Sequence, residues 1–145
     1  MTIEFKAAVF RTPHEPMSIE TVSIPSTPPP GDVLVRMRAS GLCHSDLHVI
    51  VGEWEVPTPM ILGHEGAGVV ERVGPAVRGV RPGDHVVLTF ASCGRCDLCL
   101  AGGPSYCDQF APLNSAGVLG PGDDTLSGPD GRIGGSFFGQ SSFAT

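Results

Sequence analysis

The sequence carries little positive charge. Only one of its nine basic residues is a lysine, and 15 acidic residues give the 145-residue chain a formal net charge of −6 at pH 7. No cluster of basic residues occurs along it. Nucleic acids and anionic membranes attract proteins through concentrated positive charge. The sequence therefore argues against nucleic acid and membrane as partners.

Long apolar runs are also missing. The first 16 residues, MTIEFKAAVFRTPHEP, carry charges where a signal peptide needs an apolar core. No segment approaches the roughly 18 consecutive apolar residues that indicate a membrane-spanning helix. We therefore expect a cytoplasmic protein, and five cysteines in that reducing compartment favour metal ligands or catalytic groups over disulfides.

A third absence concerns nucleotide binding. No Gly-x-Gly-x-x-Gly follows a strand-like segment, and the glycine-rich stretches GVLGPGDD and GGSFFG do not have that spacing. The fingerprint of a dinucleotide-binding domain is therefore not found in these 145 residues.

Turn-forming residues, in contrast, are abundant. The 20 glycines and 14 prolines favour a β-rich fold with many turns, and 41% hydrophobic residues are typical of a globular domain. Apolar or alternating segments predict strands over residues 5–10, 17–25, 33–39, 66–74, 85–90 and 134–145. A short helix is expected over 43–52 and loops over 91–132. The predicted fold is a small β-barrel or curled sheet with long loops.

Four of the five cysteines form a C-x2-C-x2-C-x7-C cluster: Cys93, Cys96, Cys99 and Cys107. Four thiolates so close in sequence can surround one tetrahedral zinc and leave no position for water or substrate, which predicts a structural zinc. Reduced thiols without a metal and two disulfides are the simpler alternatives. An iron–sulfur cluster is a third, but the Cys-Pro that follows such cysteines in ferredoxins is absent.

The fifth cysteine, Cys43, stands in GLCHSDLH, and His64 stands in GHEGAGVVERVG. Cysteine and histidine both bind zinc, but a catalytic zinc takes three protein ligands and keeps one position open. From residue types alone, a buried cysteine and a hydrogen-bonded histidine are the more common explanation of this pair.

The order and spacing of these motifs resemble those of the zinc-dependent alcohol dehydrogenases of the medium-chain dehydrogenase/reductase superfamily. The motif Gly-His-Glu-x-x-Gly-x5-Gly is complete in GHEGAGVVERVG, with GLCHSDLH before it and the four cysteines after it. The resemblance covers essentially residues 1–145, as an incomplete N-terminal catalytic domain with a structural-zinc lobe over 91–113. It implies a mainly β, GroES-like barrel with short helices, to which a complete enzyme adds an α/β Rossmann domain.

The resemblance implies metal-binding roles as well. Cys43 and His64 resemble two of the three protein ligands of the catalytic zinc, and the four clustered cysteines resemble the ligands of the structural zinc. Asp46 resembles the carboxylate that accepts the other ring N–H of the ligating histidine. Glu65 resembles the carboxylate behind the metal.

Five further positions are similar to substrate, cofactor and proton-relay positions of the family. Ser45 and His48 resemble the two ends of the relay that carries the alcohol proton to solvent. His44 stands where relatives contact the cofactor pyrophosphate. Trp54 and Phe137 fall near positions that line the substrate pocket, although packing in the core explains these two equally well.

The implied activity is the reversible oxidation of an alcohol to an aldehyde, with zinc as the Lewis acid and NAD(P) as the hydride acceptor. The lobe and the last residues are most similar to the aryl (benzyl) alcohol branch, with thiol-dependent formaldehyde dehydrogenases as the alternative. Small-molecule alcohols or aldehydes, and a homodimer or homotetramer, are the implied partners. The third zinc ligand and the nucleotide-binding domain are expected after Thr145, so we expect a fragment that is inactive alone and holds its second zinc weakly.

Two other functions are compatible with the sequence. A non-enzymatic, zinc-stabilised GroES-like module needs the four cysteines but not Cys43, Ser45 or His48. Zinc-free quinone or enoyl reductases share the superfamily, but they generally have neither the Cys43–His64 pair nor the cysteine lobe.

Overall fold

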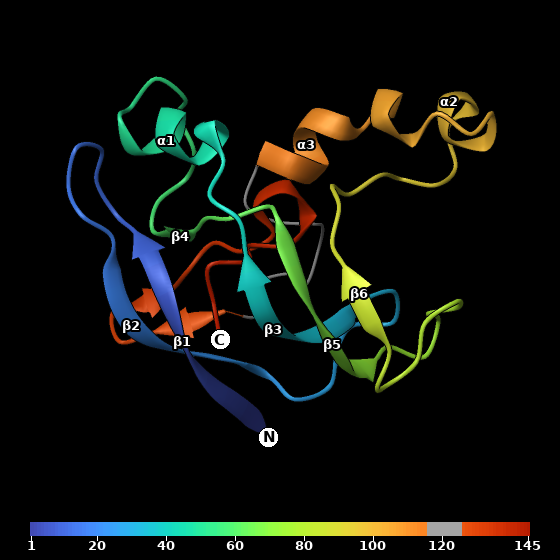
Figure 1. Cartoon of the computed structure of the whole chain (residues 1–145), viewed down its shortest axis with the longest axis horizontal. Coiled ribbons are helices and arrows are strands. Elements are labelled where there is room, and N and C mark those ends of the chain that lie inside the picture. Colours follow the sequence, from blue (N-terminus) through green and yellow to red (C-terminus); the bar gives the residue numbers. More distant parts are fainter. Residues whose placement is uncertain (116–125) are drawn as a thin grey trace.

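Two antiparallel sheets form the body of the protein (Figure 1). A computed structural model describes residues 1–115 and 126–145. The larger sheet has the order β4-β1-β2-β7-β8, with strands β1 (Thr2–Phe10), β2 (Ser18–Pro25), β4 (Met60–Ile61), β7 (Ser127–Gly128) and β8 (Gly131–Arg132). The smaller has the order β3-β5-β6, with strands β3 (Val33–Ser40), β5 (Gly66–Val73) and β6 (His85–Val87). The mainly β fold is as predicted.

Two groups of buried apolar side chains hold the sheets and the first helix together. The first group is formed by β1, β2 and β4 with one residue after β8: Ala7, Val9, Val22, Ile61 and Ile133. The second connects helix α1 (His44–Ile50) to β1, to the region of β4 and to the C-terminal segment: Phe10, Val49, Met60, Leu62 and Phe137. Because Val49 and Leu62 share this second group, α1 is packed against the chain segment that leads into His64.

The pairing of β3 with β5 brings the two zinc-ligand motifs to one end of the smaller sheet. The strands are antiparallel, and Ser40 at the end of β3 pairs with Gly66 at the start of β5. The amide of Gly41 continues the ladder by donating to the carbonyl oxygen of Glu65 at 2.9 Å. The chain that leaves β3 toward Cys43 therefore lies beside the chain that arrives from His64.

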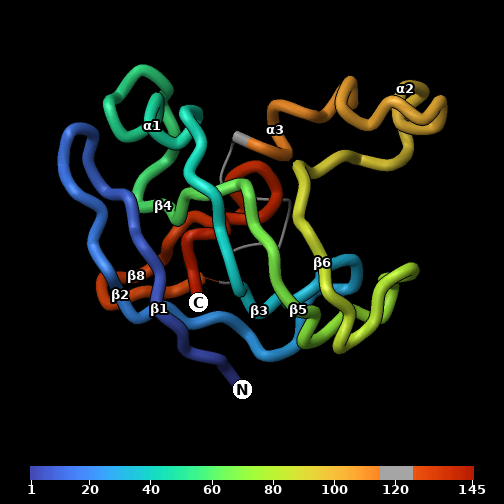
Figure 2. The backbone as a smooth tube through the Cα atoms, in the orientation of Figure 1, coloured from blue at the N-terminus to red at the C-terminus, as the bar shows by residue number. Residues whose placement is uncertain are grey.

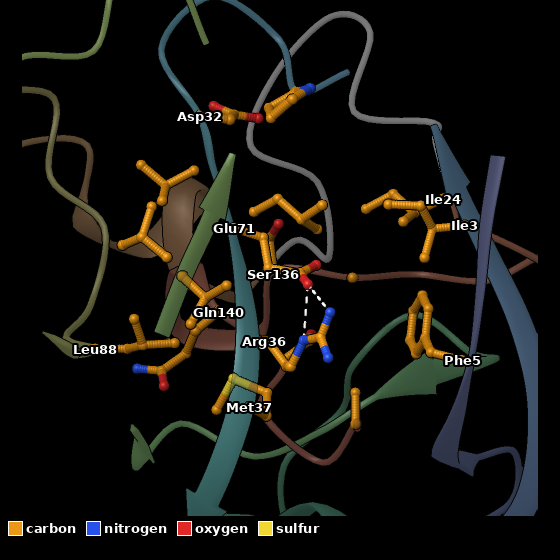
Figure 3. A pocket seen from close by; sticks show the side chains of 18 of the residues that line it. Ile3, Phe5, Ile24, Asp32, Arg36, Met37, Glu71, Leu88, Ser136 and Gln140 are labelled. Atoms are coloured by element: carbon orange, nitrogen blue, oxygen red, sulfur yellow. Dashed lines mark hydrogen bonds and ion pairs between the residues drawn. The ribbon is translucent and has the colours of Figure 1, made fainter. Parts of the chain in front are cut away.

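A cavity of 810 Å³ lies between the two sheets (Figure 3). Apolar side chains of both sheets line it, among them Phe5 of β1 and Val35 of β3. Arg36 and Glu71 form an ion pair on its lining, with the Arg36 Nε donating to Glu71 Oε1 at 2.7 Å. Neither Cys43 nor His64 belongs to the lining, so the zinc-ligand motifs lie outside this cavity.

The predicted strand over residues 134–145 is wrong. The segment contains a 3-10 turn at Phe137–Gly139, and its β-pairing consists of isolated bridges such as Ala7 to Ala144. Left-handed backbone angles at Ser136, Phe138 and Ser141, with φ of 61°, 48° and 54°, interrupt an extended chain. The segment instead runs back beside β1 (Figure 2).

The predicted loop over residues 91–132 is wrong in part. It contains helices α2 (Asp97–Leu100) and α3 (Phe110–Ser115), a 3-10 turn at Pro104–Tyr106, and the β7–β8 hairpin. Residues 116–125 of this predicted loop lie outside the described residues. Elements this short carry almost no periodic signal in the sequence. Across the described part of the chain, no helix has the length and apolar character needed to cross a membrane.

An ion pair joins Arg11, which follows β1, to Glu20 of the neighbouring strand β2. Arg11 Nε and Nη2 donate to Glu20 Oε1 and Oε2, both at 2.8 Å, and Nη2 also lies 3.1 Å from the Asp130 carboxylate. These hydrogen bonds from Arg11, together with one from Ser18, hold the pKa of Glu20 below its usual value. Because the folded-state pKa is lowered, the ionised pair stabilises the fold above the unfolded-state pKa and loses this effect as the pH falls through the folded-state value.

We therefore expect Glu20→Gln to lower the stability of the protein at pH 7 but not in acid. Urea denaturation of both proteins from pH 7 downward measures the difference. Glu15→Gln, at an exposed turn position, is the control and should match the unchanged chain throughout. If Glu20→Gln lowers the free energy of unfolding by the same amount at every pH down to the acid end of the series, the charge of Glu20 is not the cause of the loss.

Candidate metal centres

The four clustered cysteines converge in space. Cys96 precedes α2, Cys99 lies within it, and Cys107 follows the 3-10 turn. All four sulfur atoms lie within 4.8 Å of one another, and the Cys93 and Cys99 sulfurs are 4.0 Å apart. Tetrahedral zinc with bonds of about 2.3 Å places its sulfur ligands about 3.8 Å apart. The four sulfurs therefore fit a single zinc ion, and all five cysteines of the chain are free of disulfides.

Backbone amides point at two of these sulfurs. Cys93 Sγ accepts from the amides of Arg95 at 3.5 Å and Cys96 at 3.3 Å, and Cys107 Sγ accepts from the amides of Cys93 and Gln109 at 3.3 Å each. The hydrogen bonds that Cys93 accepts from backbone amides lower its pKa to about 6. Burial and a hydrogen bond with the neighbouring Cys96 raise the pKa of Cys99 to about 12. Four thiolates this close repel one another unless a cation lies among them. The group is therefore suited to a divalent cation, whose binding releases the protons that the thiols still carry.

A buried asparagine fixes the lobe that carries these cysteines. Asn114 of α3 is 1% exposed; its amide nitrogen donates to the carbonyls of Ala91 and Phe110 at 2.9 and 2.7 Å. Its side-chain oxygen accepts from the Ala91 amide at 2.8 Å. Ala91, the first residue of the lobe, is thus hydrogen-bonded to Asn114 of α3, just after the last residue of the lobe. The four cysteines lie between Ala91 and Asn114 in the sequence.

The second predicted centre also converges. Cys43, immediately before α1, His64 and Glu65 place one ligand atom each within 4.8 Å of the others. Cys43 and His64 are half-buried and Glu65 is exposed, so the group lies at the surface. A thiol, an imidazole and a carboxylate are all zinc ligands, and the sequence-predicted pair of Cys43 and His64 is brought together.

Asp46 holds the two halves of this centre in place. Its carboxylate is fully buried; Oδ2 accepts from the Cys43 amide at 3.1 Å and Oδ1 accepts from the Gly63 amide at 3.0 Å. A left-handed φ of 87° at Gly63, which glycine adopts without strain, turns the chain into His64. One side chain therefore fixes the backbone beside both candidate ligands.

The imidazole of His64 faces Asp46 on one edge. Nδ1 is buried and lies 3.4 Å from Asp46 Oδ1, but the two groups are not aligned as a hydrogen bond. This leaves Nε2 as the nitrogen for a metal, with a carboxylate behind the ring, as is usual for metal-ligating histidines. The predicted Asp46–His64 hydrogen bond therefore stays a prediction, although the side chains are adjacent.

The predicted relay residues lie along α1. The Ser45 hydroxyl oxygen is 3.7 Å from Cys43 Sγ, next to the candidate zinc ligands. His48, one turn later, contacts Glu53 through Nδ1 and His44 through Nε2. Ser45 and His48 lie three residues apart on the helix, which places them on neighbouring parts of one face.

Aromatic side chains surround His48 and His64. Trp54 is 45% exposed and stacks on His48, with ring centroids 5.0 Å apart. Phe137 is 1% exposed and belongs to the core, with its ring edge-on to His64 at 5.6 Å. The ring of Phe138 lies closer, with its centroid 4.7 Å from that of the His64 ring.

Residues 29–137 match the family model of the alcohol dehydrogenase GroES-like domain. The chain belongs to the alcohol dehydrogenase family. The resemblance seen in the motifs, and the GroES-like fold it implied, are thereby confirmed.

Several relatives of this alcohol dehydrogenase domain match nearly the whole chain. A geraniol dehydrogenase from Castellaniella defragrans is 46% identical over 99% of the chain and 38% of its own length. The crystal structure of an alcohol dehydrogenase zinc-binding domain protein from Burkholderia ambifaria matches with a TM-score of 0.93 and 49% identity, over 99% of this chain and 39% of that one. A benzyl alcohol dehydrogenase from Acinetobacter calcoaceticus matches with a TM-score of 0.90 and 38% identity, over 99% and 38%. The chain therefore spans less than two-fifths of the length of these relatives.

Proposed function

We propose that this chain is the zinc-binding, substrate-side part of an NAD(P)-dependent alcohol dehydrogenase that interconverts a primary alcohol and its aldehyde. The observation that carries the proposal is the buried Asp46 carboxylate, which ties the Cys43 amide to the Gly63 amide beside His64. A buried carboxylate is retained where its charge is satisfied by hydrogen bonds. Its place between the two ligand motifs supports a metal centre rather than an unrelated cysteine and histidine.

Each residue at this centre has a role in the proposal. Cys43 and His64 hold the catalytic zinc, with Glu65 beside them, and the four clustered cysteines hold the structural zinc of a lobe over residues 91–113. Zinc held by Cys43 and His64 would supply a Lewis acid for the substrate oxygen, which would lower the pKa of the alcohol. The Ser45 hydroxyl, next to the ligands, would accept the alcohol proton while it passes its own proton to a ribose hydroxyl of the cofactor. That hydroxyl would in turn pass a proton to the half-exposed His48, which releases one to solvent.

The proposed substrate class is an aryl or similar unsaturated primary alcohol. Phe138 and Phe137 present aromatic surface to His64, which favours an apolar group on the carbinol carbon. The similarity to a benzyl alcohol dehydrogenase and a geraniol dehydrogenase supports the same class. His44 as a contact of the cofactor pyrophosphate, a cytoplasmic location, and a homodimer or homotetramer also belong to this proposal.

A chimera tests the proposal, because the chain contains no dinucleotide fingerprint of its own. The chain replaces the matching part of the Acinetobacter calcoaceticus benzyl alcohol dehydrogenase, and NAD(P) reduction is followed with benzyl alcohol, geraniol and a thiol–formaldehyde adduct. We expect turnover of the first two alcohols. Ser45→Ala is expected to lower kcat by about 100-fold or more, since general acid–base groups contribute about 10²–10⁴.

Ser105→Ala, at an exposed position of the lobe, is the matched control and should leave kcat unchanged. Preference for the formaldehyde adduct would overturn the aryl assignment. A folded, zinc-loaded chimera that binds the nicotinamide cofactor but oxidises none of the three substrates would favour a non-enzymatic zinc-stabilised module.

A further inference from the structure

We propose that His44 and His48 form a third metal site, for a divalent late-transition cation such as Ni²⁺ or Zn²⁺, distinct from the two cysteine-containing centres. The two histidines lie four residues apart on α1, so their side chains project from the same face of the helix. Imidazole nitrogens are preferred ligands of Zn²⁺, Cu²⁺ and Ni²⁺.

The two facing ring nitrogens already have the separation of a chelating pair. His44 Nδ1 lies 3.1 Å from His48 Nε2, and the rings meet edge to face with centroids 4.7 Å apart. Two nitrogens on one metal, with bonds of about 2.0–2.1 Å, lie about 2.9–3.4 Å apart for bond angles between square and tetrahedral. A cation can therefore bridge these two nitrogens once the exposed His44 ring rotates to aim its lone pair at the metal.

Glu53 orients His48 for this role. Its carboxylate contacts His48 Nδ1 on the side of the ring opposite His44. A carboxylate on one ring nitrogen places the proton there and leaves the other nitrogen's lone pair free for a metal. The negative charge of Glu53 also offsets part of the charge of a bound cation.

The backbone after the helix holds Glu53 and the ring in position. The amides of Glu53 and Trp54 both donate to the carbonyl oxygen of His48, at 2.8 and 3.1 Å. Gly52, with φ of 73°, allows the chain to fold back in this way. Trp54 then stacks on the His48 ring with an interplanar angle of 20°. The orientation of His48 is thus fixed from three sides before a metal arrives.

The proposed site is open to solvent. His44 is exposed and the His48 side chain is 32% exposed, so water can complete the coordination of a cation held by two protein ligands. Two nitrogen ligands bind more weakly than four thiolates, so the site is expected to fill only after the cysteine centre. One consequence rests on the proposed function: a cation here occupies the nitrogen of His48 that would carry the relay proton, and excess metal then inhibits.

Calorimetric titration of the zinc-loaded chain with Ni²⁺ tests the site without any assay of activity. We expect one binding event per chain, without thiolate-to-nickel charge-transfer absorption. His44→Gln and His48→Gln should each abolish it, and Glu53→Ala should weaken it by about 10- to 100-fold, as loss of a carboxylate behind a ligating histidine does.

His85→Gln, on the exposed β6 strand, is the matched control and should bind Ni²⁺ as the unchanged chain does. All of these side chains are at least partly exposed, and circular dichroism together with retained zinc shows that each variant is folded. Binding that survives His44→Gln or His48→Gln, binding accompanied by thiolate absorption, or no binding by the unchanged chain would overturn the proposal. These outcomes leave the proposed dehydrogenase function untouched, because that function does not require a metal at His44.

Discussion

Replacing Asp46 by alanine is expected to lower the free energy of unfolding by about 2–6 kcal/mol. The carboxylate is fully buried and satisfies the amides of Cys43 and Gly63. Each buried donor left without a partner costs about 1–3 kcal/mol, and Asp46→Ala leaves two amide donors without their acceptor. The same change should weaken zinc binding at Cys43 and His64 by about 10- to 100-fold, because the ligand backbone and the His64 ring lose their common support.

Urea denaturation and zinc competition measure the two effects of Asp46→Ala. Asp130→Ala, whose side chain is 78% exposed, is the control and should leave both quantities close to those of the unchanged chain. Asp46→Asn keeps one acceptor oxygen and should fall between the two. Equal stability of the Asp46→Ala and Asp130→Ala proteins would show that the carboxylate does not organise the centre.

Serine in place of Cys107 is expected to remove the tightly bound zinc and unfold the lobe, while the two sheets stay folded. Helix α2 has four residues and α3 has six, too short to form without tertiary support. In the proposed function a structural zinc supplies that support, since sites of this type bind with apparent free energies of about 10–16 kcal/mol. Neither group of buried apolar side chains that holds the sheets includes a residue of the lobe.

Amide hydrogen exchange separates these two parts of the protein. In the Cys107→Ser variant, the amides of Leu100, Gly103 and Tyr106, which bond within the lobe, should lose protection. Amides of the β1–β2 ladder should keep theirs. Cys43→Ser is the matched control, because it removes a cysteine without touching the lobe. Loss of protection in both parts of Cys107→Ser would contradict a local role for this zinc.

Strand periodicity and motif spacing anticipated much of this structure. The alternating segment 17–25 became β2, and the apolar segments around 33–39 and 66–74 became β3 and β5. Their antiparallel pairing then places Cys43 near His64, which spacing along the chain alone does not show. The alternation of apolar and polar residues indicates which face of a strand is buried. It was sufficient to predict the strands that are long enough for the alternation to repeat.

The C-terminal segment shows what periodicity misses. In GGSFFGQSSFAT an apolar pair and two serines suggest a strand, yet the Ser141 hydroxyl accepts from the Phe137 amide at 2.9 Å and donates to the Ile61 carbonyl at 2.6 Å. These bonds close a tight turn against a strand some 80 residues away in sequence. A tertiary contact of this kind overrides local preference and leaves no pattern in the sequence.

The support for the metal centre was likewise only partly visible in the sequence. Family motifs pointed to Asp46, but not to its bonds with two backbone amides, which depend on how α1 meets the segment before His64. The stacking of Trp54 on His48, which depends on the chain folding back after Gly52, was not predicted. Both features depend on loop geometry rather than on residue type.

Zinc competition with a chromophoric chelator, on chain loaded with two equivalents of zinc, tests the central claim most directly: this chain carries two cysteine-containing metal centres that differ in affinity. The purified chain should release zinc in two steps, one tight equivalent that disappears in Cys107→Ser and one weaker equivalent that disappears in Cys43→Ser. Two equally tight equivalents, or a tight equivalent that survives Cys107→Ser, would contradict the account.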